Sequence, residues 1–162
     1  MQAKELNIRF YEITSEDELS EEDKRLVVLA REISSKAYAP YSGFFVGAAA
    51  ELDNGEVVTG NNQENAAFPS GLCAERVAVF HANSIYPDQG IKTIAITAQN
   101  RYGSVRLPVT PCGACRQVLL ETEIRFGKPI RIILDGREKM LLFEGIENLL
   151  PFSFNPASLN QN

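Results

Sequence analysis

The three cysteines of the chain restrict its fold more than any other feature, because each lies where a helix is predicted to begin. Cys73 opens the segment Cys-Ala-Glu-Arg, and Cys112 and Cys115 belong to the later segment Pro-Cys-Gly-Ala-Cys-Arg-Gln. Thiolates at helix N-termini are stabilised by the helix dipole and by free backbone amides, which lowers their pKa. Two cysteines three apart across a first helical turn can direct both sulfurs at one ion. A fold that brings the two helix starts together therefore makes a site with three sulfur ligands.

Length and charge place the rest of the chain in a single globular domain. The 162 residues are 44% hydrophobic and 23% charged, enough for a buried core, and the odd number of cysteines argues against a disulfide framework. The net charge of −5 and the pI near 5.0 disfavour a surface for nucleic acid or anionic membranes. The charged N-terminus argues against a signal peptide, and no apolar run is long enough for a membrane helix. We therefore expect a cytoplasmic protein with reduced thiols, and neither nucleic acid nor membrane as a partner.

The periodicity of apolar residues predicts alternating helices and strands after residue 20. Helices are predicted at residues 21–37, 74–84, 113–125 and 145–149, and strands at residues 44–51, 56–60, 91–98, 130–135 and 138–143. This order predicts an α/β fold, a three-layer α/β/α domain around one mixed five-stranded sheet, over residues 20–162. Residues 1–19 form an N-terminal extension, for which a flexible tail is favoured over a short strand on the edge of a neighbour.

The cysteine pattern alone leaves several kinds of site open. A Cys-x-x-Cys pair also occurs in redox-active pairs, in halves of structural zinc sites and among unpaired buried thiols. A redox pair leaves Cys73 without a role, and a structural zinc site normally has four protein ligands. Three ligands with an open fourth position suit catalytic zinc instead. The single histidine, His81, lies two turns into its predicted helix, and we expect an ordinary helix residue rather than a fourth ligand.

Glu75 favours the catalytic alternative. It comes two positions after Cys73, in the first turn of the same predicted helix and beside the open position of the metal. A carboxylate there can take a proton from a zinc-activated water and hand it on, although a helix N-terminus also favours an acid for its dipole alone. Arg76 and Arg116 each follow a cysteine motif, and either can donate a hydrogen bond to a thiolate and reduce the negative charge of the centre.

Five separated motifs of the chain occur in the order and spacing of one enzyme family. They are Tyr-Ser-Gly-Phe-Phe-Val-Gly-Ala-Ala at residues 41–49, Asn-Gln-Glu-Asn-Ala-Ala at 62–67, Cys-Ala-Glu-Arg at 73–76, Pro-Cys-Gly-Ala-Cys-Arg-Gln at 111–117 and Leu-Leu-Pro at 149–151. Cys-Ala-Glu followed by Pro-Cys-x-x-Cys is the zinc deaminase signature, with cysteine in place of the first histidine. From about Ser20 to Phe154 the chain resembles the cytidine deaminase family in its small homotetrameric form.

The resemblance implies a role for each of several residues. By it, the zinc ligands are Cys73, Cys112 and Cys115, the proton shuttle is Glu75, the arginine that supports the thiolates is Arg76, and the substrate-binding residues are Phe44, Asn62, Glu64, Ala74 and Phe154. Asn62 and Glu64 would bind the ribose hydroxyls, and Phe44 would pack against the pyrimidine. Phe154 would enter the site of a neighbouring subunit. Asn and Glu two apart in an extended segment do point the same way and offer donors and acceptors to vicinal hydroxyls, although turn chemistry also explains an Asn-rich stretch.

The reaction implied by the resemblance is hydrolysis of cytidine and deoxycytidine to uridine and deoxyuridine, with release of ammonia and one zinc per subunit. The rival activities are deamination of an antibiotic such as blasticidin S, of a nucleotide or of a polynucleotide, and the rival from another class is a non-catalytic zinc-stabilised binding module. The low pI disfavours a polynucleotide substrate, and a nucleotide would need cations around its phosphate. Asn62 and Glu64 favour a ribose. Phe45 and Phe68 depart from the usual Pro and Tyr of the family motifs, so we expect local packing to differ there.

Overall fold

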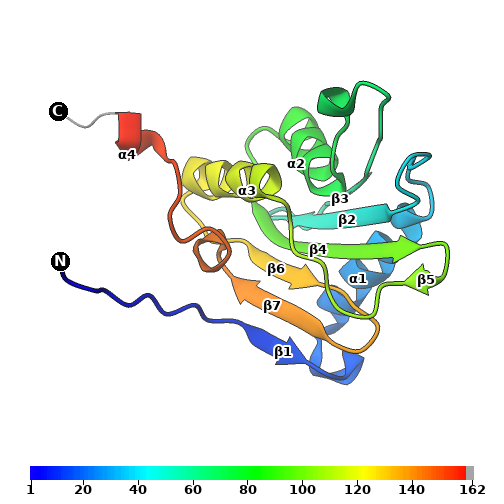
Figure 1. The fold of residues 1–162 in the computed structure, drawn as a ribbon, viewed down its shortest axis with the longest axis horizontal. Helices are drawn as coiled ribbons and strands as arrows, with labels where there is room; N and C mark the ends of the chain where they lie inside the picture. Colours follow the sequence, from blue (N-terminus) through cyan, green and yellow to red (C-terminus); the bar gives the residue numbers. More distant parts are fainter. Residues whose placement is uncertain (160–162) are drawn as a thin grey trace.

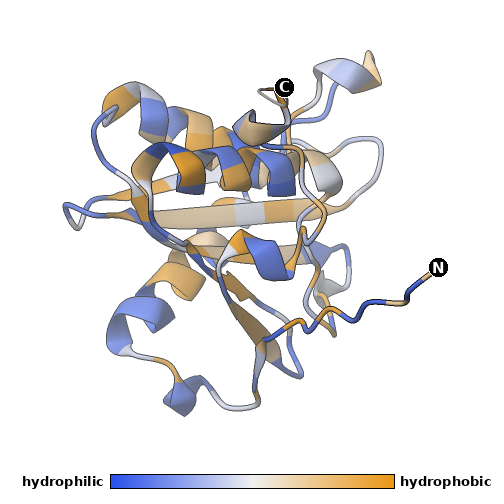
Figure 2. Cartoon of the chain, turned by 90° about the vertical axis from the view of Figure 1, so that its left-hand side faces the viewer, coloured by the Kyte–Doolittle hydropathy of each residue, from blue (hydrophilic) through white to orange (hydrophobic). Residues whose placement is uncertain are grey.

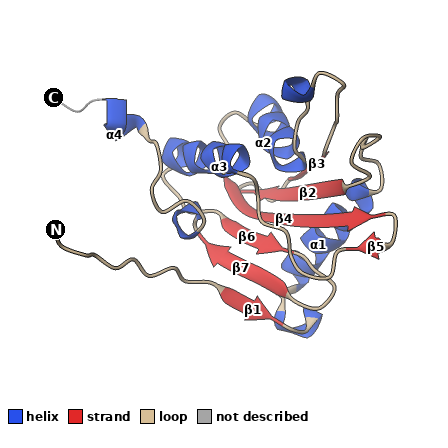
Figure 3. Ribbon diagram, viewed as in Figure 1, coloured by secondary structure: helices blue, strands red, loops and turns tan. Residues whose placement is uncertain are grey.

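The computed structural model describes residues 1–159 and shows a mixed β-sheet between two layers of helices (Figures 1 and 3). The strands are β1 (Tyr11–Ile13), β2 (Phe45–Leu52), β3 (Val57–Asn61), β4 (Ile91–Asn100), β5 (Gly103–Ser104), β6 (Arg131–Leu134) and β7 (Met140–Glu144). The helices are α1 (Glu21–Ser34), α2 (Ala74–Ile85), α3 (Gly113–Phe126) and α4 (Pro156–Leu159), with 3₁₀ turns at Glu16–Glu18, Phe68–Ser70 and Ile146–Asn148. The other predicted helices and strands are present with their boundaries shifted by at most a few residues, whereas the helix predicted at residues 145–149 is a single 3₁₀ turn. Within residues 1–159, no helix is both long enough and apolar enough to cross a bilayer.

The sheet has the strand order β1-β7-β6-β4-β2-β3, and β5 pairs with the end of β4. β4 and β6 run parallel, whereas the other neighbouring strands run antiparallel. The α/β architecture with a mixed sheet is confirmed, but the described chain has seven strands in it where five were expected. The additional strands, β1 and β5, have only three and two residues, too few for a readable alternation of apolar and polar side chains.

Part of the N-terminal extension belongs to the chain's own sheet. β1 lies antiparallel to β7, with Tyr11 opposite Leu142. The Phe10 ring packs against Phe143 at a centroid distance of 5.7 Å. The expectation of a flexible tail is therefore wrong for residues 11–13, and the strand covers the edge of β7 in the same chain instead of a neighbour's edge. Pairing with a strand so distant in sequence leaves no local signal, because it depends on which edge the folded sheet exposes.

Alternating side chains of β2 divide the core between the two faces of the sheet. Ala48 and Ala50 belong to the apolar cluster that includes Ala78 of α2, whereas Ala49 belongs to the cluster that includes Leu26 of α1. α1 therefore covers one face, and α2 and α3 cover the other. Figure 2 shows these helices on opposite sides of the sheet.

Two glycines let the helices lie close to the sheet. A Cβ on Gly47 of β2 would lie 2.0 Å from the carbonyl oxygen of Ala30 in α1. A Cβ on Gly60 of β3 would lie 2.4 Å from the main-chain nitrogen of Ala78 in α2. The second contact matters for the site described below, because it sets the depth at which the first turn of α2 meets the sheet.

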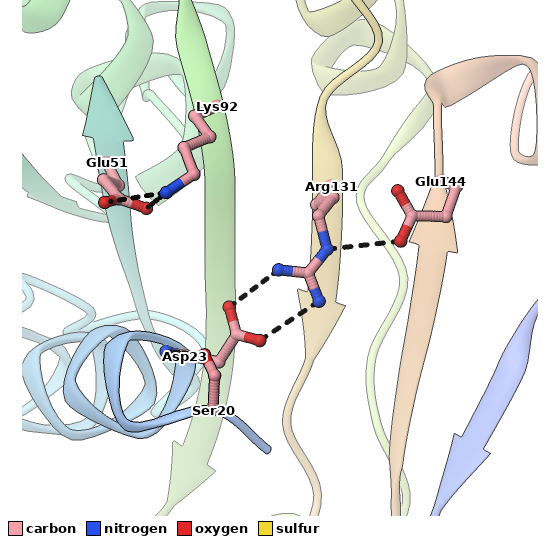
Figure 4. A network of polar contacts seen from close by, with 6 residues as sticks. All are labelled: Ser20, Asp23, Glu51, Lys92, Arg131 and Glu144. Atoms are coloured by element: carbon pink, nitrogen blue, oxygen red, sulfur yellow. Dashed lines mark hydrogen bonds and ion pairs between the residues drawn. The ribbon is translucent and has the colours of Figure 1, made fainter. Parts of the chain in front are cut away.

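The start of α1 is capped and then tied to the sheet by ion pairs (Figure 4). Ser20 Oγ accepts a hydrogen bond from the Asp23 main-chain nitrogen at 3.1 Å. The Asp23 carboxylate accepts two hydrogen bonds from the Arg131 guanidinium, at 3.0 and 3.1 Å. Arg131 Nε also donates to Glu144 at 3.2 Å, so a single arginine links α1, β6 and β7.

Candidate metal centre and active site

Two loops bring the three cysteine thiols together at the starts of α2 and α3. Cys73 is the N-cap residue of α2, Cys112 is the N-cap residue of α3, and Cys115 lies in the first turn of α3. Neither cap side chain bonds to its helix backbone, so both sulfurs remain available. The Sγ atoms of Cys73 and Cys112 are 3.8 Å apart and those of Cys112 and Cys115 are 3.5 Å apart. All three sulfurs lie within 4.8 Å of one another.

The donor set fits a tetrahedral zinc ion. Ligands at about 2.3 Å from zinc stand ~3.8 Å from one another in a tetrahedron. The observed sulfur separations of 3.5 and 3.8 Å are close to that value. Within residues 1–159, this is the only group of three or more ligand side chains so close together, and His81 lies exposed on α2 outside it. Three thiolates leave the fourth position to a ligand from solvent, as catalytic zinc requires.

Hydrogen bonds within the cluster favour the thiolate form of Cys73. The hydrogen bond from the Cys115 thiol lowers the pKa of Cys73 to about 5, and the Arg76 guanidinium adds to this effect. The same hydrogen bond, together with burial, raises the pKa of the Cys115 thiol, because Cys115 is the donor. Cys73 is therefore more readily ionised than Cys115, and a bound divalent ion would displace the remaining thiol protons.

The two arginines that follow the cysteine motifs have different partners. Arg76 Nη2 donates to Cys73 Sγ at 3.8 Å, and Arg76 Nε is buried with no hydrogen-bond partner among the described residues. Arg116 instead donates to the carbonyl oxygens of Pro111 at 2.8 Å and Leu149 at 2.6 Å. The expectation that either arginine donates to a thiolate therefore holds for Arg76. Arg116 also donates to Thr110 Oγ1 at 3.0 Å, so it holds the loop before α3 against the C-terminal segment.

Glu75 lies beside the cysteine cluster in a buried position. It is in the first turn of α2 and is 5% exposed. Burial raises the pKa of its carboxyl group, and the negative charge of Cys73 raises it further. A carboxyl group with a raised pKa binds a proton more readily near neutral pH than an exposed glutamate does, which suits general acid–base catalysis.

A cavity of about 790 Å³ opens in front of Cys73, Cys112 and Glu75. Three predicted substrate-binding residues line it: Phe44, Asn62 and Glu64. Arg76 is also part of the lining. Two other predicted residues are not part of the lining, because Ala74 is fully buried and Phe154 lies on the exposed C-terminal segment.

The cavity lining also includes residues that sequence reasoning missed. Those not predicted include Tyr41, Ser42, Val46, Ile96, Ala98, Val109 and Thr110. Alternation along β2 and β4 puts Val46 on the side of Phe44, and Ile96 on the side of Ala98. Val46 lies opposite Ala98 in the sheet, so these residues form one apolar wall. The alternation of side chains along each strand could be read from the sequence. Which residues of β2 and β4 lie side by side could not, because that depends on the register between the two strands.

The side chains of Asn62 and Glu64 line the cavity and are held by the segment that leads into β2. Asn62 Oδ1 accepts from the main-chain nitrogen of Val46 at 2.7 Å, and Asn62 Nδ2 donates to the carbonyl oxygen of Phe44 at 2.9 Å. The hydrogen bond from the Ser42 hydroxyl is the largest of several that lower the pKa of Glu64. Glu64 is therefore an ionised acceptor, and Asn62 retains one amide N–H as a donor.

Residues 20–126 of the chain match the family model described as the cytidine and deoxycytidylate deaminase zinc-binding region. The chain belongs to this family. The matched residues of this deaminase region include all three cysteines, and zinc is the cofactor that their cluster fits.

Individual relatives carry names from the same deaminase family. The cytidine deaminase of Halalkalibacterium halodurans is 43% identical over 129 residues, which cover 76% of this chain and 87% of the relative. That of Mycobacterium tuberculosis is 42% identical over 105 residues, which cover 63% of this chain and 74% of the relative. Among solved structures, the cytidine deaminase from Burkholderia pseudomallei aligns with a TM-score of 0.70 at 34% identity, covering 81% of this chain and 98% of that chain. Sequence and fold thus agree on the deaminase family.

Proposed function

We propose that the chain is a zinc-dependent enzyme that hydrolyses cytidine and deoxycytidine to uridine and deoxyuridine with release of ammonia, a reaction of pyrimidine salvage. One observation carries this proposal: a buried glutamate, Glu75, lies beside three cysteine sulfurs at a cavity that Asn62 and Glu64 also line. Relatives named cytidine deaminase, at 42% and 43% identity, support the same reaction.

We assign the zinc ligands to Cys73, Cys112 and Cys115, and the proton shuttle to Glu75. When bound, zinc supplies a water acidic enough to ionise near neutral pH. Glu75 takes a proton from the attacking water and delivers it to the ring nitrogen beside C4, as the water oxygen adds to C4. Glu75 then moves the remaining hydroxyl proton to the amino group, which leaves as ammonia. Burial of Glu75 supports this role, because its raised pKa lets the carboxyl group hold the proton between the two transfers.

The lining of the cavity supports a nucleoside as the substrate. Asn62 offers an amide donor and Glu64 an ionised acceptor, a combination that suits a sugar hydroxyl. We assign Phe44 to packing against the pyrimidine ring. Ala74 is buried, and we assign it a contact through its main-chain N–H, one of the amides left free at the start of α2. Among the described residues, Arg76 is the only Lys or Arg in the cavity lining, and it donates a hydrogen bond to Cys73. The lining that the structure describes therefore offers no free cation that would favour a phosphate group.

We further propose a cytoplasmic homotetramer in which each site is shared between subunits. Phe154 is 60% exposed, and its carbonyl oxygen accepts a hydrogen bond from Gln117 at 2.8 Å. The C-terminal segment runs out from the body of the molecule (Figure 1). A phenylalanine held in solvent in this way suits insertion into the cavity of a neighbouring subunit. We expect sedimentation to show a tetramer and Phe154→Ala to lower activity. A monomer with full activity would contradict the shared site.

The deciding experiment is an ammonia-release assay on the zinc-loaded protein with cytidine, deoxycytidine, CMP, cytosine and blasticidin S. We expect turnover of the two nucleosides and little turnover of the other three compounds. Preference for CMP would indicate a nucleotide deaminase, and preference for blasticidin S an antibiotic deaminase. Zinc binding without ammonia release from any of the five would indicate a non-catalytic zinc-stabilised module.

A further inference from the structure

The segment between α1 and β2 is fastened to the segment that carries Glu64. The main-chain nitrogen of Tyr38 donates to the Asn62 carbonyl oxygen at 3.0 Å, and the nitrogen of Glu64 donates to the Tyr38 carbonyl oxygen at 2.8 Å. Gly43 closes the turn in the left-handed region, with a φ of +62°, and its nitrogen donates to the Ala39 carbonyl oxygen at 3.0 Å. The turn and the Glu64 segment therefore form one unit at the mouth of the cavity.

Ser42 stands at the centre of this unit. Its Oγ donates to Glu64 Oε1 at 2.5 Å and accepts a hydrogen bond from the Phe44 main-chain nitrogen at 3.0 Å. The Ser42 hydroxyl therefore links the carboxylate of Glu64, assigned to the sugar, with the backbone of Phe44, assigned to the base. Hydrogen bonds to an ionised acceptor are shorter and stronger than those between neutral groups.

We propose that Ser42 is a positioning residue for substrate recognition, which fixes the Glu64 carboxylate relative to Phe44. This inference deepens the proposed function and rests on it. Glu64 Oε2 also accepts from the main-chain nitrogens of Tyr41 at 2.8 Å and Ser42 at 3.3 Å, and a substitution of the Ser42 side chain leaves these two donors in place. Loss of the hydroxyl therefore frees Oε1 to rotate without removing the carboxylate from the cavity.

The expected effect concerns binding of the sugar and leaves the proton transfers alone. Ser42 belongs to the turn before β2, whereas Glu75 and the cysteines belong to α2 and α3. A residue that orients an acceptor for a sugar hydroxyl contributes equally to the ground state and the transition state, so its loss raises KM and leaves kcat nearly unchanged. The rise in KM should also be confined to substrates whose sugar carries the hydroxyls that Glu64 would bind.

The test compares Ser42→Ala with the wild-type zinc-loaded protein on cytidine and on 2′,3′-dideoxycytidine, which has the same base without the two hydroxyls. We expect KM for cytidine to rise about three- to tenfold with kcat within about twofold, and kcat/KM for the dideoxy compound to change less than about twofold. Ser42→Thr keeps a hydroxyl and should restore the cytidine KM. Ser35→Ala is the matched control, because that exposed serine donates to a helix carbonyl oxygen, Glu32 O at 2.7 Å, away from the cavity.

Several outcomes would overturn the inference while leaving the proposed function intact. Equal losses on both substrates, a fall in kcat at constant KM, or no change on cytidine would each remove Ser42 from sugar recognition. Failure of Ser42→Thr to restore KM in a protein that melts like wild type would do the same. The proposed function fails separately, when the wild-type protein itself releases no ammonia from cytidine.

Discussion

Two buried carboxylates on opposite sides of the sheet show how differently one fold uses the same chemical group. Asp135, which follows β6, is 3% exposed and accepts two hydrogen bonds from Arg31 of α1, both at 2.8 Å, and one from Thr97 at 2.7 Å. Glu75 of α2 is 5% exposed, but no Lys or Arg nitrogen of residues 1–159 lies within ion-pair distance of its carboxylate. Burial therefore raises the pKa of Glu75.

The difference separates a carboxylate that holds the fold together from one that can exchange a proton. When a buried charge is fully hydrogen-bonded, removing one of its partners is strongly destabilising. A buried carboxylate with no lysine or arginine paired directly to it can change its protonation state more readily, which is what a proton shuttle needs. We therefore expect substitutions at Glu75 to affect turnover, and substitutions around Asp135 to affect stability.

The largest expected effect is that of Glu75→Gln on turnover. The amide keeps the shape of the side chain but cannot accept and return a proton, so kcat should fall by about 10²- to 10⁴-fold. Zinc content, measured by elemental analysis, should stay at one per chain, and the free energy of unfolding should not fall. Glu121→Gln, an exposed substitution on α3, is the control and should change neither kcat, nor zinc content, nor the free energy of unfolding. Near-wild-type activity in Glu75→Gln would remove this residue from the reaction.

The second largest effect is expected on stability, from removal of the arginine that pairs with Asp135. Arg31→Met removes both hydrogen bonds from Arg31 to Asp135 and leaves a buried charge with Thr97 alone, so the free energy of unfolding should fall by about 2–4 kcal/mol. Denaturant unfolding at fixed protein and zinc concentrations measures this change, and kcat/KM per folded molecule should stay at the wild-type value. The double variant Arg31→Met/Asp135→Asn removes the uncompensated charge and should recover part of the loss. A fall in kcat/KM without a loss of stability would show that the two carboxylates do not divide the tasks in this way.

The sequence predicts Glu75 and its surroundings better than Asp135, because the two sites are encoded at different distances along the chain. Cys73, Glu75 and the Cys-x-x-Cys pair form local patterns at two helix starts. Because one zinc ion needs its sulfur ligands close together, the two patterns can be assigned to the same site from the sequence. Arg31 and Asp135 are 104 residues apart, and nothing in either local segment indicates the pairing. The link from Ser42 to Glu64 was missed for a similar reason, since it depends on the shape of a turn. The helices and long strands were predictable from periodicity, whereas β1 and β5 were too short.

A smaller effect is expected from deletion of residues 1–13, which tests whether the extension serves only the Asp135 side of the sheet. The deletion removes the pairing of β1 with β7 and the ion pair between Glu12 and Lys139, but it keeps Glu16, which bonds to Arg31 at 2.8 Å. A few cross-strand pairs contribute about 1–2 kcal/mol in total and the buried Ile13 side chain adds to this, so thermal unfolding should occur at a lower temperature with unchanged kcat/KM. The exposed edge of β7 should also increase aggregation on heating. Loss of activity in a well-folded deletion variant would instead connect the extension to the cavity.

The smallest effect concerns Glu123 of α3, whose environment is intermediate between those of Glu75 and Asp135. Its Oε1 accepts from the main-chain nitrogens of Ile130 at 2.8 Å and Ile146 at 2.9 Å, and burial raises its pKa above the ordinary value of 4.5. Because the folded protein binds this proton more tightly than the unfolded chain does, Glu123 reduces the free energy of unfolding as pH rises from 4.5 through its raised pKa. Glu123→Gln keeps an acceptor without the titration.

We therefore expect wild type to lose stability relative to Glu123→Gln over that pH range, by less than about 1 kcal/mol because the side chain is only partly buried and solvent screens its charge. Denaturant unfolding of both proteins from pH 4.5 upward measures the difference, with Glu121→Gln as the exposed control. A wild type that gains stability relative to Glu123→Gln as pH rises would show that the two main-chain donors outweigh burial. The lack of a directly paired lysine or arginine would then no longer be enough to distinguish the proton shuttle from a structural carboxylate.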